Sequence, residues 1–290
     1  MTGIITPSNG LRFGRSPYAG TRSGQARLHD PDALANALYP SSHGDTLFRV
    51  INFDDIAAAG GLAAVMGGFV EAKDAGATSW AYAAIEGGAL RGVTGNTIND
   101  GISLRGPIIF KGDLNAGFQV KFKADDVAPI SVEMGFLNAA PTDATTTAVS
   151  DIDTPAFQTA PAEAAMIHID TLETLNTFAL VTKSATYTTN YKKTFFTPHE
   201  DQASTTGVGL TAASWMTARM QLEGDAVRGM LFGPTGKLLA ESIIAPAAAG
   251  TLTGGIEGGT LLAPWFSVVT LSAESKTLDI GKIMWWQDEF

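Results

Sequence analysis

Short stretches in which apolar and polar residues alternate recur along most of this chain. In GFQVKFKADD (117–126), every second residue from Phe118 to Phe122 is apolar, and polar residues stand between them. A period of two predicts strands that bury one face, and no long stretch has the period of a helix. Roughly a dozen such stretches follow one another between turns, which predicts an all-β, antiparallel jelly-roll β-sandwich.

The connections between these stretches are of two kinds. EGDA (223–226) and GPTGK (233–237) contain glycine and suit hairpin turns. The segments 138–163 and 245–260 are longer and rich in small residues, so we expect surface loops, where binding residues often lie. Because neither segment is a clear linker, we expect one sandwich domain over residues 46–290.

Residues 1–45 differ from the rest of the chain. They mix Gly, Ser, Pro and Arg with isolated apolar residues and show neither period. This composition predicts an extended N-terminal arm that becomes ordered along a partner. A single short helix is expected over residues 29–38, with Asp30 as the N-cap and Pro31 in the first turn.

Charge is distributed unevenly between the arm and the body. The formal net charge is −10, but residues 1–29 contain four arginines and no acidic residue, which leaves 15 basic and 29 acidic residues for the remainder. An acidic body argues against a nucleic-acid partner. The basic arm is expected to dock on something acidic, such as a neighbouring copy. The arm residues expected to make this contact are Arg12, Phe13, Arg15, Tyr18, Arg22 and Arg27.

Disulfides, thiolate metal sites and membrane spans are not expected. The chain has no cysteine, and its first thirty residues lack the apolar region of a signal peptide. The longest uncharged apolar run, residues 56–70, is too short and too rich in glycine to cross a membrane. We therefore expect no membrane association.

Two groups of residues could supply metal ligands. His168 and Asp170 are two residues apart, so they share a strand face, although a polar face without metal is the commoner explanation. Asp143 and the SDIDTP segment (150–155) could offer oxygen ligands to calcium, but the glycine-punctuated calcium pattern is missing. We therefore expect no metal site and no cofactor, and calcium is the open alternative.

The acidic residues do not form a recognisable catalytic pattern. A sandwich glycosidase needs two carboxylates flanking the bond, often as Glu-x-Asp-x-Glu on one strand. Glu223 and Asp225 provide only part of this pattern at an expected turn, Glu133 stands alone, and Asp288 and Glu289 lie at the chain end. There is also no G-x-S-x-G motif. We expect no catalytic residues and a non-enzymatic protein.

The final segment, KTLDIGKIMWWQDEF (276–290), contains two adjacent tryptophans, Trp285 and Trp286, which must point to opposite faces of a strand. Leu278 and Trp285 also have opposite parity, so either the strand bulges near Gly281 or it is covered on both faces. We predict that one of the two rings lies in the core and that the other is buried by an arm or a partner. Ligand stacking is the alternative for the second ring.

The C-terminal two thirds of the chain resemble a known group of proteins. The succession of strands and turns in this part resembles that of tailed-phage virion proteins with a concanavalin-like, lectin-like jelly roll. The resemblance lies in two segments, WMTARMQLEGDAVRGMLFGPTGKLLAES and GTLLAPWFSVVTLSAESKTLDIGKIMWWQDE. The resemblance covers about residues 105–290 and carries no catalytic motif. It implies a capsid decoration, head-fibre or accessory subunit on the outer capsid surface of the virion. It further implies a homo-oligomer, with a trimer favoured, tethered by the arm to the major capsid protein or to neighbouring copies.

Two other functions remain open at this point. A lectin-like host-attachment module would bind a host-surface glycan through loop aromatics, or through loop acids with calcium. A sandwich glycosidase or depolymerase would need two carboxylates about 5–10 Å apart in a groove.

Overall fold

The computed structural model describes residues 46–53, 69–85, 88–139, 149–151, 156–157, 161–172, 176–185, 191–200, 207–245 and 254–288. The expected helix and the six arm residues named above lie outside these ranges. Within them the chain forms antiparallel strands and one three-residue 3-10 turn, η3 (Gly112–Leu114). No helix in the described part is long and apolar enough to cross a membrane.

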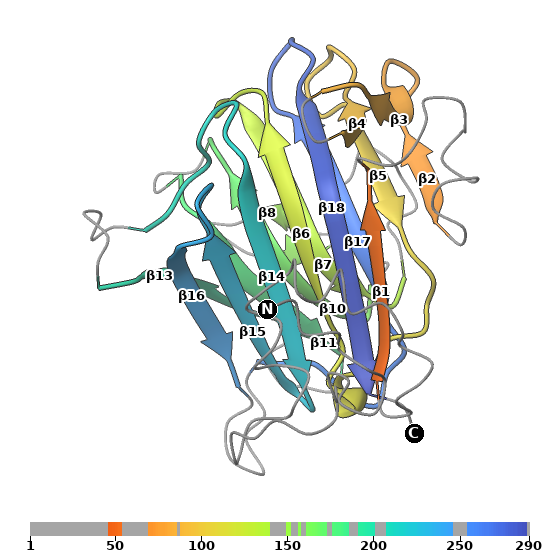
Figure 1. Cartoon of the computed structure of the whole chain (residues 1–290), viewed down its shortest axis with the longest axis vertical. Helices are drawn as coiled ribbons and strands as arrows, with labels where there is room; N and C mark the ends of the chain where they lie inside the picture. The colour runs from red at the N-terminus through yellow and green to blue at the C-terminus, as the bar shows by residue number, and fades with distance from the viewer. Residues whose placement is uncertain are drawn as a thin grey trace, which may run out of the picture.

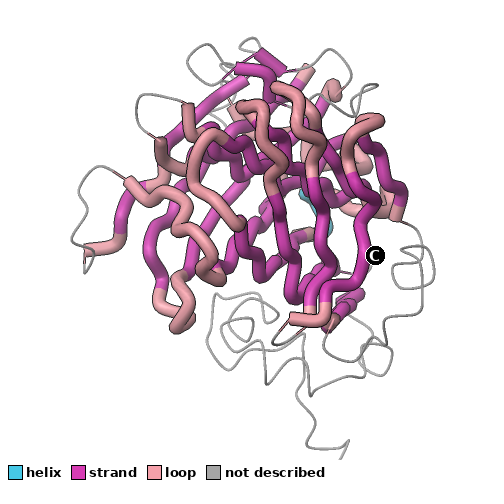
Figure 2. Tube along the Cα trace, turned by 90° about the horizontal axis from the view of Figure 1, so that it is seen from above, coloured by secondary structure: helices cyan, strands magenta, loops and turns pink. Residues whose placement is uncertain are grey.

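Two large sheets stack face to face (Figures 1 and 2). The nine-stranded sheet has the order β13 (Thr197–Pro198), β16 (Leu238–Ile244), β15 (Ala226–Phe232), β14 (Met216–Glu223), β6 (Gly117–Ala124), β18 (Thr277–Asp288), β4 (Ala89–Val93) and β3 (Thr78–Ala83), with β1 (Thr46–Asn52) also paired to β18. The seven-stranded sheet has the order β12 (Tyr191–Phe195), β11 (Ala179–Ser184), β10 (Glu163–Asp170), β7 (Ile130–Leu137), β17 (Ala263–Thr270), β5 (Gly101–Arg105) and β2 (Val70–Lys73). The predicted antiparallel jelly-roll sandwich is confirmed.

The inward faces of the sheets form the core that the alternation predicts. Phe118, from β6, lies with its ring centroid 5.3 Å from that of Phe136 in β7 and 5.7 Å from that of Phe266 in β17. Both contacts are edge-to-face, the arrangement that aromatic rings prefer in cores. All three side chains are fully buried. The polar residues between the apolar ones in β6 point away from this core, so β6 follows its sequence pattern.

Strand β18 organises the nine-stranded sheet. It pairs with β6 along one side, while its other side pairs with β4 over Thr277–Ile280 and with β1 over Lys282–Asp288 (Figure 1). The sequence left two alternatives for β18, a bulge near Gly281 or a strand covered on both faces. The register with β6 shifts between Ile280 and Lys282, so the bulge is present where the partner changes from β4 to β1, and both faces of the strand are largely buried as well. The bulge changes which residues point inward, and it places Leu278, Ile280, Ile283 and Trp285 in one core.

The glycine-containing turns lie where the sequence predicts them, but one segment that was expected to be a loop contains two short strands. Gly224 (φ 61°) lies in the β14–β15 hairpin, and Gly236 (φ 78°) lies in the β15–β16 connection, where glycine avoids the cost of positive φ. The segment 138–163, expected to be entirely loop, contains a two-stranded ribbon of β8 (Val149–Asp151) and β9 (Ala156–Phe157). These strands are too short for the alternation to reveal them.

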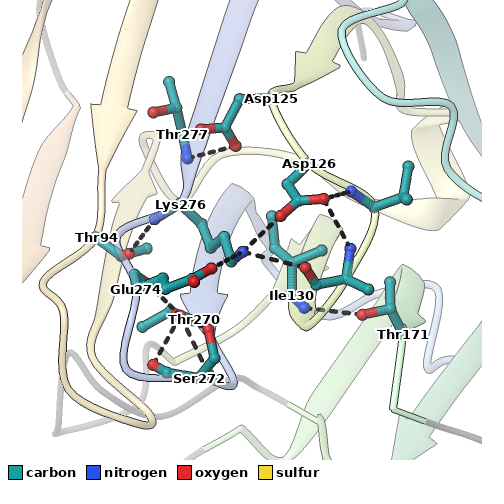
Figure 3. A network of polar contacts seen from close by, with 12 residues as sticks. Thr94, Asp125, Asp126, Ile130, Thr171, Thr270, Ser272, Glu274, Lys276 and Thr277 are labelled. Carbon is teal, nitrogen blue, oxygen red and sulfur yellow. Dashed lines mark hydrogen bonds and ion pairs between the residues drawn. The ribbon is translucent and has the colours of Figure 1, made fainter.

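One end of the sandwich is held by Lys276, whose side chain is almost fully buried (Figure 3). Its Nζ donates to Asp126 Oδ2 at 2.7 Å, to the Ala128 carbonyl at 3.1 Å and to Glu274 Oε2 at 3.3 Å. Burial by itself lowers the pKa of Lys276, but the hydrogen bonds that its ammonium group donates to Asp126 and Glu274 outweigh this effect and raise the pKa. The ammonium group therefore stays charged and joins the β6–β7 loop to the start of β18.

We expect Lys276→Met to lower the free energy of unfolding by about 2 kcal/mol, because it removes charged hydrogen bonds and leaves the Ala128 carbonyl without its donor. Urea unfolding would measure this change. Lys73→Met, at an exposed position on edge strand β2, is the control and should change stability by less than about 0.5 kcal/mol. Equal changes in the free energy of unfolding for the two substitutions would show that the Lys276 hydrogen bonds do not stabilise the fold.

Candidate functional site

The two adjacent tryptophans at the chain end point to opposite faces of the nine-stranded sheet. Trp285 belongs to the core, where its ring centroid lies 5.5 Å from that of Phe69. Trp286 lies outside this core cluster, on the outer face, and yet only 3% of its surface is exposed. A large side chain that points away from the core and is still buried is covered by other residues of the same chain, so the outer face around it is packed like a core.

The ring of Trp286 is held between a glycine and an arginine. Gly117 is its cross-strand partner in β6, and a Cβ atom there would overlap Trp286 Cζ2 and lie 2.5 Å from Cε2. The Arg219 guanidinium carbon lies 5.4 Å from the centroid of the Trp286 ring, which is cation–π geometry. Trp286 Nε1 is buried and has no hydrogen-bond partner within the described residues.

Sequence alternation did not reveal the burial of the polar neighbours on this face. Arg219 and Gln221 fall at outward positions of β14, where polar residues are normally solvated, but they are only 2% and 3% exposed. Burial, followed by the charge of Arg228, lowers the pKa of Arg219 to about 10, so the side chain is still charged at neutral pH. Met284 and Met230 are buried on the same face, which we call the Trp286 face. It consists of Gly117, Arg219, Gln221, Met230, Met284 and Trp286.

A second buried group lies at the centre of the outer face of the seven-stranded sheet. Glu133 is fully buried in β7, and its Oε2 accepts hydrogen bonds from Trp265 Nε1 at 3.0 Å and from Ser267 Oγ at 3.3 Å. On the other side of β7, His168 is the cross-strand partner of Glu133. The register of three strands therefore brings together residues up to 134 positions apart in the sequence.

His168 in this group does not have the geometry of a catalytic triad. Its Nε2 lies 3.2 Å from Ser131 Oγ and 4.0 Å from Glu133 Oε1, whereas in a triad the acid and the hydroxyl contact different ring nitrogens. Its Nδ1 has no hydrogen-bond partner within the described part. Burial, followed by the charge of Lys193, lowers the pKa of His168 to about 3, so the ring is neutral at physiological pH.

The structure also places the residues considered for metal binding. His168 and Asp170 share a face as expected, but His168 contacts Ser131, and Asp170 Oδ1 accepts from the backbone N–H of Leu172 at 2.8 Å. The described residues include no group of three or more side chains suited to hold a metal. Asp143 and residues 152–155 of the proposed calcium segment lie outside the described ranges.

The remaining candidate carboxylates lie at turns or strand ends. Asp225, in the β14–β15 turn, accepts from the Gly258 N–H at 2.9 Å, and Asp288 accepts from the side-chain amide of Asn115. Glu223 is exposed at the end of β14, and Glu289 lies outside the described residues. Of the acidic residues singled out in the sequence, Glu133 and Asp170 are diagonal neighbours across β7 and β10. Because Glu133 is fully buried, this pair offers no open groove to a substrate.

The fold is an antiparallel two-sheet jelly-roll β-sandwich with buried polar groups on both outer faces. No protein-family model and no curated protein sequence matches the chain. Among solved structures, a protein of unknown function from Shewanella oneidensis MR-1, SO2946, is similar with a TM-score of 0.50 and 10% identity over 99% of this chain and 96% of that chain. This likeness concerns the fold alone.

Two further structures have lower scores. Peanut lectin is 11% identical, with a TM-score of 0.48 over 83% of this chain and 97% of its own. The CBM2 module of the evolved Dit of Lactobacillus casei BL23 phage J-1 is 11% identical, with a TM-score of 0.46 over 85% and 97%. Neither comparison assigns a ligand or a functional residue to this chain.

Proposed function

We propose that this protein is a non-enzymatic structural subunit of a tailed-phage virion, a capsid decoration or accessory head protein. Its sandwich is displayed on the outer capsid surface, and residues 1–45 tether it to the major capsid protein or to neighbouring copies. The strand and turn pattern of residues 105–290, which resembles such proteins, supports this assignment.

The observation that carries the proposal is the burial of the Trp286 face. Tryptophan, arginine and methionine are the residue types enriched where one protein surface covers another. Here Trp286, Arg219 and Met284 lie together on an outward sheet face, each at most 3% exposed. Because the structure contains a single chain, this burial comes from the chain itself, and it fits a sandwich whose outer face is covered by a further segment of the same chain.

The start of strand β1 connects this face to the arm. Thr46 is the cross-strand partner of Asp288, and Phe48 is the partner of Trp286. The arm therefore joins the sandwich at the end of β18 that carries the Trp286 face, within a few residues of the buried ring. A basic arm attached there can extend along an acidic partner while the sandwich stays folded.

The absence of an enzymatic role is also part of the proposal. Among the described acidic residues, Glu133 occupies the most central position on either outer face, and it is fully buried beneath its hydrogen-bond donors. A general acid or nucleophile must reach its substrate, and a carboxylate in this environment does not. The group is better explained as a satisfied polar core between β7 and β17.

Deletion of residues 1–40 tests the tether. We expect the truncated protein to keep a folded sandwich, by circular dichroism, but to lose incorporation into particles when it is the only copy supplied. The matched variant replaces Arg12, Arg15, Arg22 and Arg27 with glutamine and should reduce incorporation while keeping the length of the arm. Normal incorporation of the truncated protein would rule out the tether.

A second candidate function, carbohydrate binding, is favoured by one observation. The chain has five tryptophans, and all of them are described. Four are buried, whereas Trp215 remains partly exposed on the outer face of the nine-stranded sheet. An accessible indole is a side chain on which sugar rings can stack.

A further inference from the structure

Five strands each place one residue in a row across the outer face of the nine-stranded sheet. The row consists of the successive cross-strand partners Phe48, Trp286, Gly117, Gln221 and Arg228. Their strands, β1, β18, β6, β14 and β15, lie side by side in Figure 1. Neighbouring strands are about 4.8 Å apart, so the row extends about 19 Å from β1, the strand into which residues 1–45 lead.

Three side chains of this row hold buried donors that have no acceptor. Trp286 Nε1, Gln221 Nε2 and Arg228 Nε are buried and have no hydrogen-bond partner within the described part of the chain. Arg228 Nη2 donates to Glu241 Oε2 at 2.6 Å, but this contact does not involve Nε. Because these nitrogens only donate, a group that satisfies them must bring carbonyl or carboxylate oxygens.

The described strands do not cover the row. Trp286 and Gln221 point outward and are each only 3% exposed. The described elements that pack closely on β14 and β18 are their neighbours in the sheet and the turn η3. Neighbouring strands lie in the plane of a sheet and leave its outer face open. The burial therefore points to a cover from a part of the chain outside the described ranges.

Two such segments adjoin the row. Residues 1–45 lead into β1 at one end of it, and residues 246–253 follow β16 at the other. The second segment has no acidic side chain and leads to Gly254, where an added Cβ atom would be 2.5 Å from Lys192 Cδ in the other sheet. It therefore ends at the seven-stranded sheet and brings no carboxylate to the row.

The last part of the N-terminal segment has the acceptors that the row needs. Residues 1–29 carry four arginines and no acidic residue, so their charged side chains add only donors. Residues 30–45 contain no arginine or lysine and carry Asp30, Asp32 and Asp45. Carboxylates accept strongly from indole, amide and guanidinium N–H groups. The acidic part of the segment is thus the chemical complement of the row.

The same part of the chain also has an apolar side and sufficient length. Leu34 and Leu38 are four positions apart in the helix expected over residues 29–38, so they share one side of it. A helix this short is stable only when such a side is packed against another surface. Residues 30–45 reach about 50 Å when extended and about 24 Å as a helix, so either conformation spans the row.

We propose that residues 30–45, the anchor segment, lie across the Trp286 face of their own chain. The anchor segment starts from β1, so Asp30 and Asp32 reach the Arg228 end of the row. Its backbone carbonyls accept from Trp286 and Gln221, and its leucines pack against the indole and the neighbouring methionines. Residues 1–29 then extend beyond β15 with their arginines available to a partner.

This anchoring does not depend on the virion assignment. It concerns a contact within one chain, which is measured on the purified protein, whereas the tether is measured by incorporation into particles. The arm can tether without anchoring, and it can anchor without tethering, so failure of either proposal is recognised separately.

The test uses the full-length protein, which has no cysteine, with one cysteine introduced at the row. We expect Gln221→Cys to react with a maleimide at least about tenfold more slowly than Ile243→Cys, which replaces a residue that is 54% exposed. In the Gln221→Cys background, an anchor variant should accelerate the reaction by about tenfold or more. This variant combines Asp30→Asn, Asp32→Asn, Leu34→Ser and Leu38→Ser. The matched control replaces Arg12, Arg15, Arg22 and Arg27 with glutamine and should leave the rate unchanged.

Photo-crosslinking identifies the cover without relying on a substitution in the row. A benzophenone maleimide on Ile243→Cys, beside Arg228, should crosslink to residues 30–45 of the same chain with a yield that does not depend on protein concentration. A cooperative urea transition checks that each variant is folded. Crosslinks to residues 246–253 or to any other segment would overturn the proposal, and so would a yield that rises with concentration, which indicates a second copy. Rapid labelling of Gln221→Cys, or equal rates in the anchor and arginine variants, would also overturn it.

Discussion

Trp286→Ala is expected to lower the free energy of unfolding by about 3–5 kcal/mol, the cost of truncating a buried tryptophan in a core. The residue is on an outward sheet face, but its 3% exposure places the ring in a core-like environment. Urea unfolding of the purified protein measures the change. Trp215→Ala, on the same sheet but partly exposed, is the control and should cost less than about 1 kcal/mol.

A double-mutant cycle of Gly117 and Trp286 tests whether the indole ring of Trp286 packs against Gly117. Gly117→Ala inserts a Cβ where Trp286 Cζ2 lies, so it should cost about 2–3 kcal/mol through overpacking. In the Trp286→Ala background this cost should shrink, although the Met220 carbonyl 2.8 Å from the added atom keeps part of it. Additive effects of the two substitutions would show that the ring does not rest on Gly117.

The second large effect is a dependence of stability on pH that originates in His168. Its pKa is lowered to about 3 in the folded protein by burial, against about 6.5 when unfolded. Above pH 6.5 the ring is neutral in both states and contributes no difference. Between pH 6.5 and 3 only the unfolded state takes up the proton, so this group removes stability at about 1.4 kcal/mol per pH unit.

Comparison with His168→Gln isolates this contribution from the carboxylates that titrate in the same range. Urea unfolding at pH 7, 6, 5 and 4 should show a steeper loss of stability in the wild type than in the variant. The difference in slope matters more than the stability at pH 7, because glutamine also alters the contact with Ser131. Parallel pH profiles would contradict a buried, neutral His168.

The architecture was largely predictable, because the alternation of residue types along a strand reflects which of its two faces is buried. The alternation in GFQVKFKADD reflects a strand with one buried face, and β6 buries Phe118, Val120 and Phe122 as expected. The change of parity along β18 indicated either a bulge or a strand covered on both faces, since a single extra residue exchanges the two faces, and the structure contains the bulge. Glycines in short connections predicted the hairpins for a similarly local reason.

The candidate sites were much less predictable. The sequence indicated that Trp285 and Trp286 point to opposite faces, but not which of them enters the core, nor that Arg219 is buried against Trp286. Glu133 was considered alone because its hydrogen-bond donors, Trp265 and Ser267, come from a strand more than 130 positions away. Alternation cannot indicate which strands become neighbours.

The sequence by itself determined a two-faced antiparallel sandwich, because the period of side chains along a strand is a local property of the backbone. Only the tertiary structure decided what each outer face carries. The order of strands in the sheet placed Trp286 and Gln221 on either side of Gly117, and the bulge at Gly281 made room for Trp215. These contacts depend on register between distant segments, which is set by the packing of the whole core and is not recorded within any one strand.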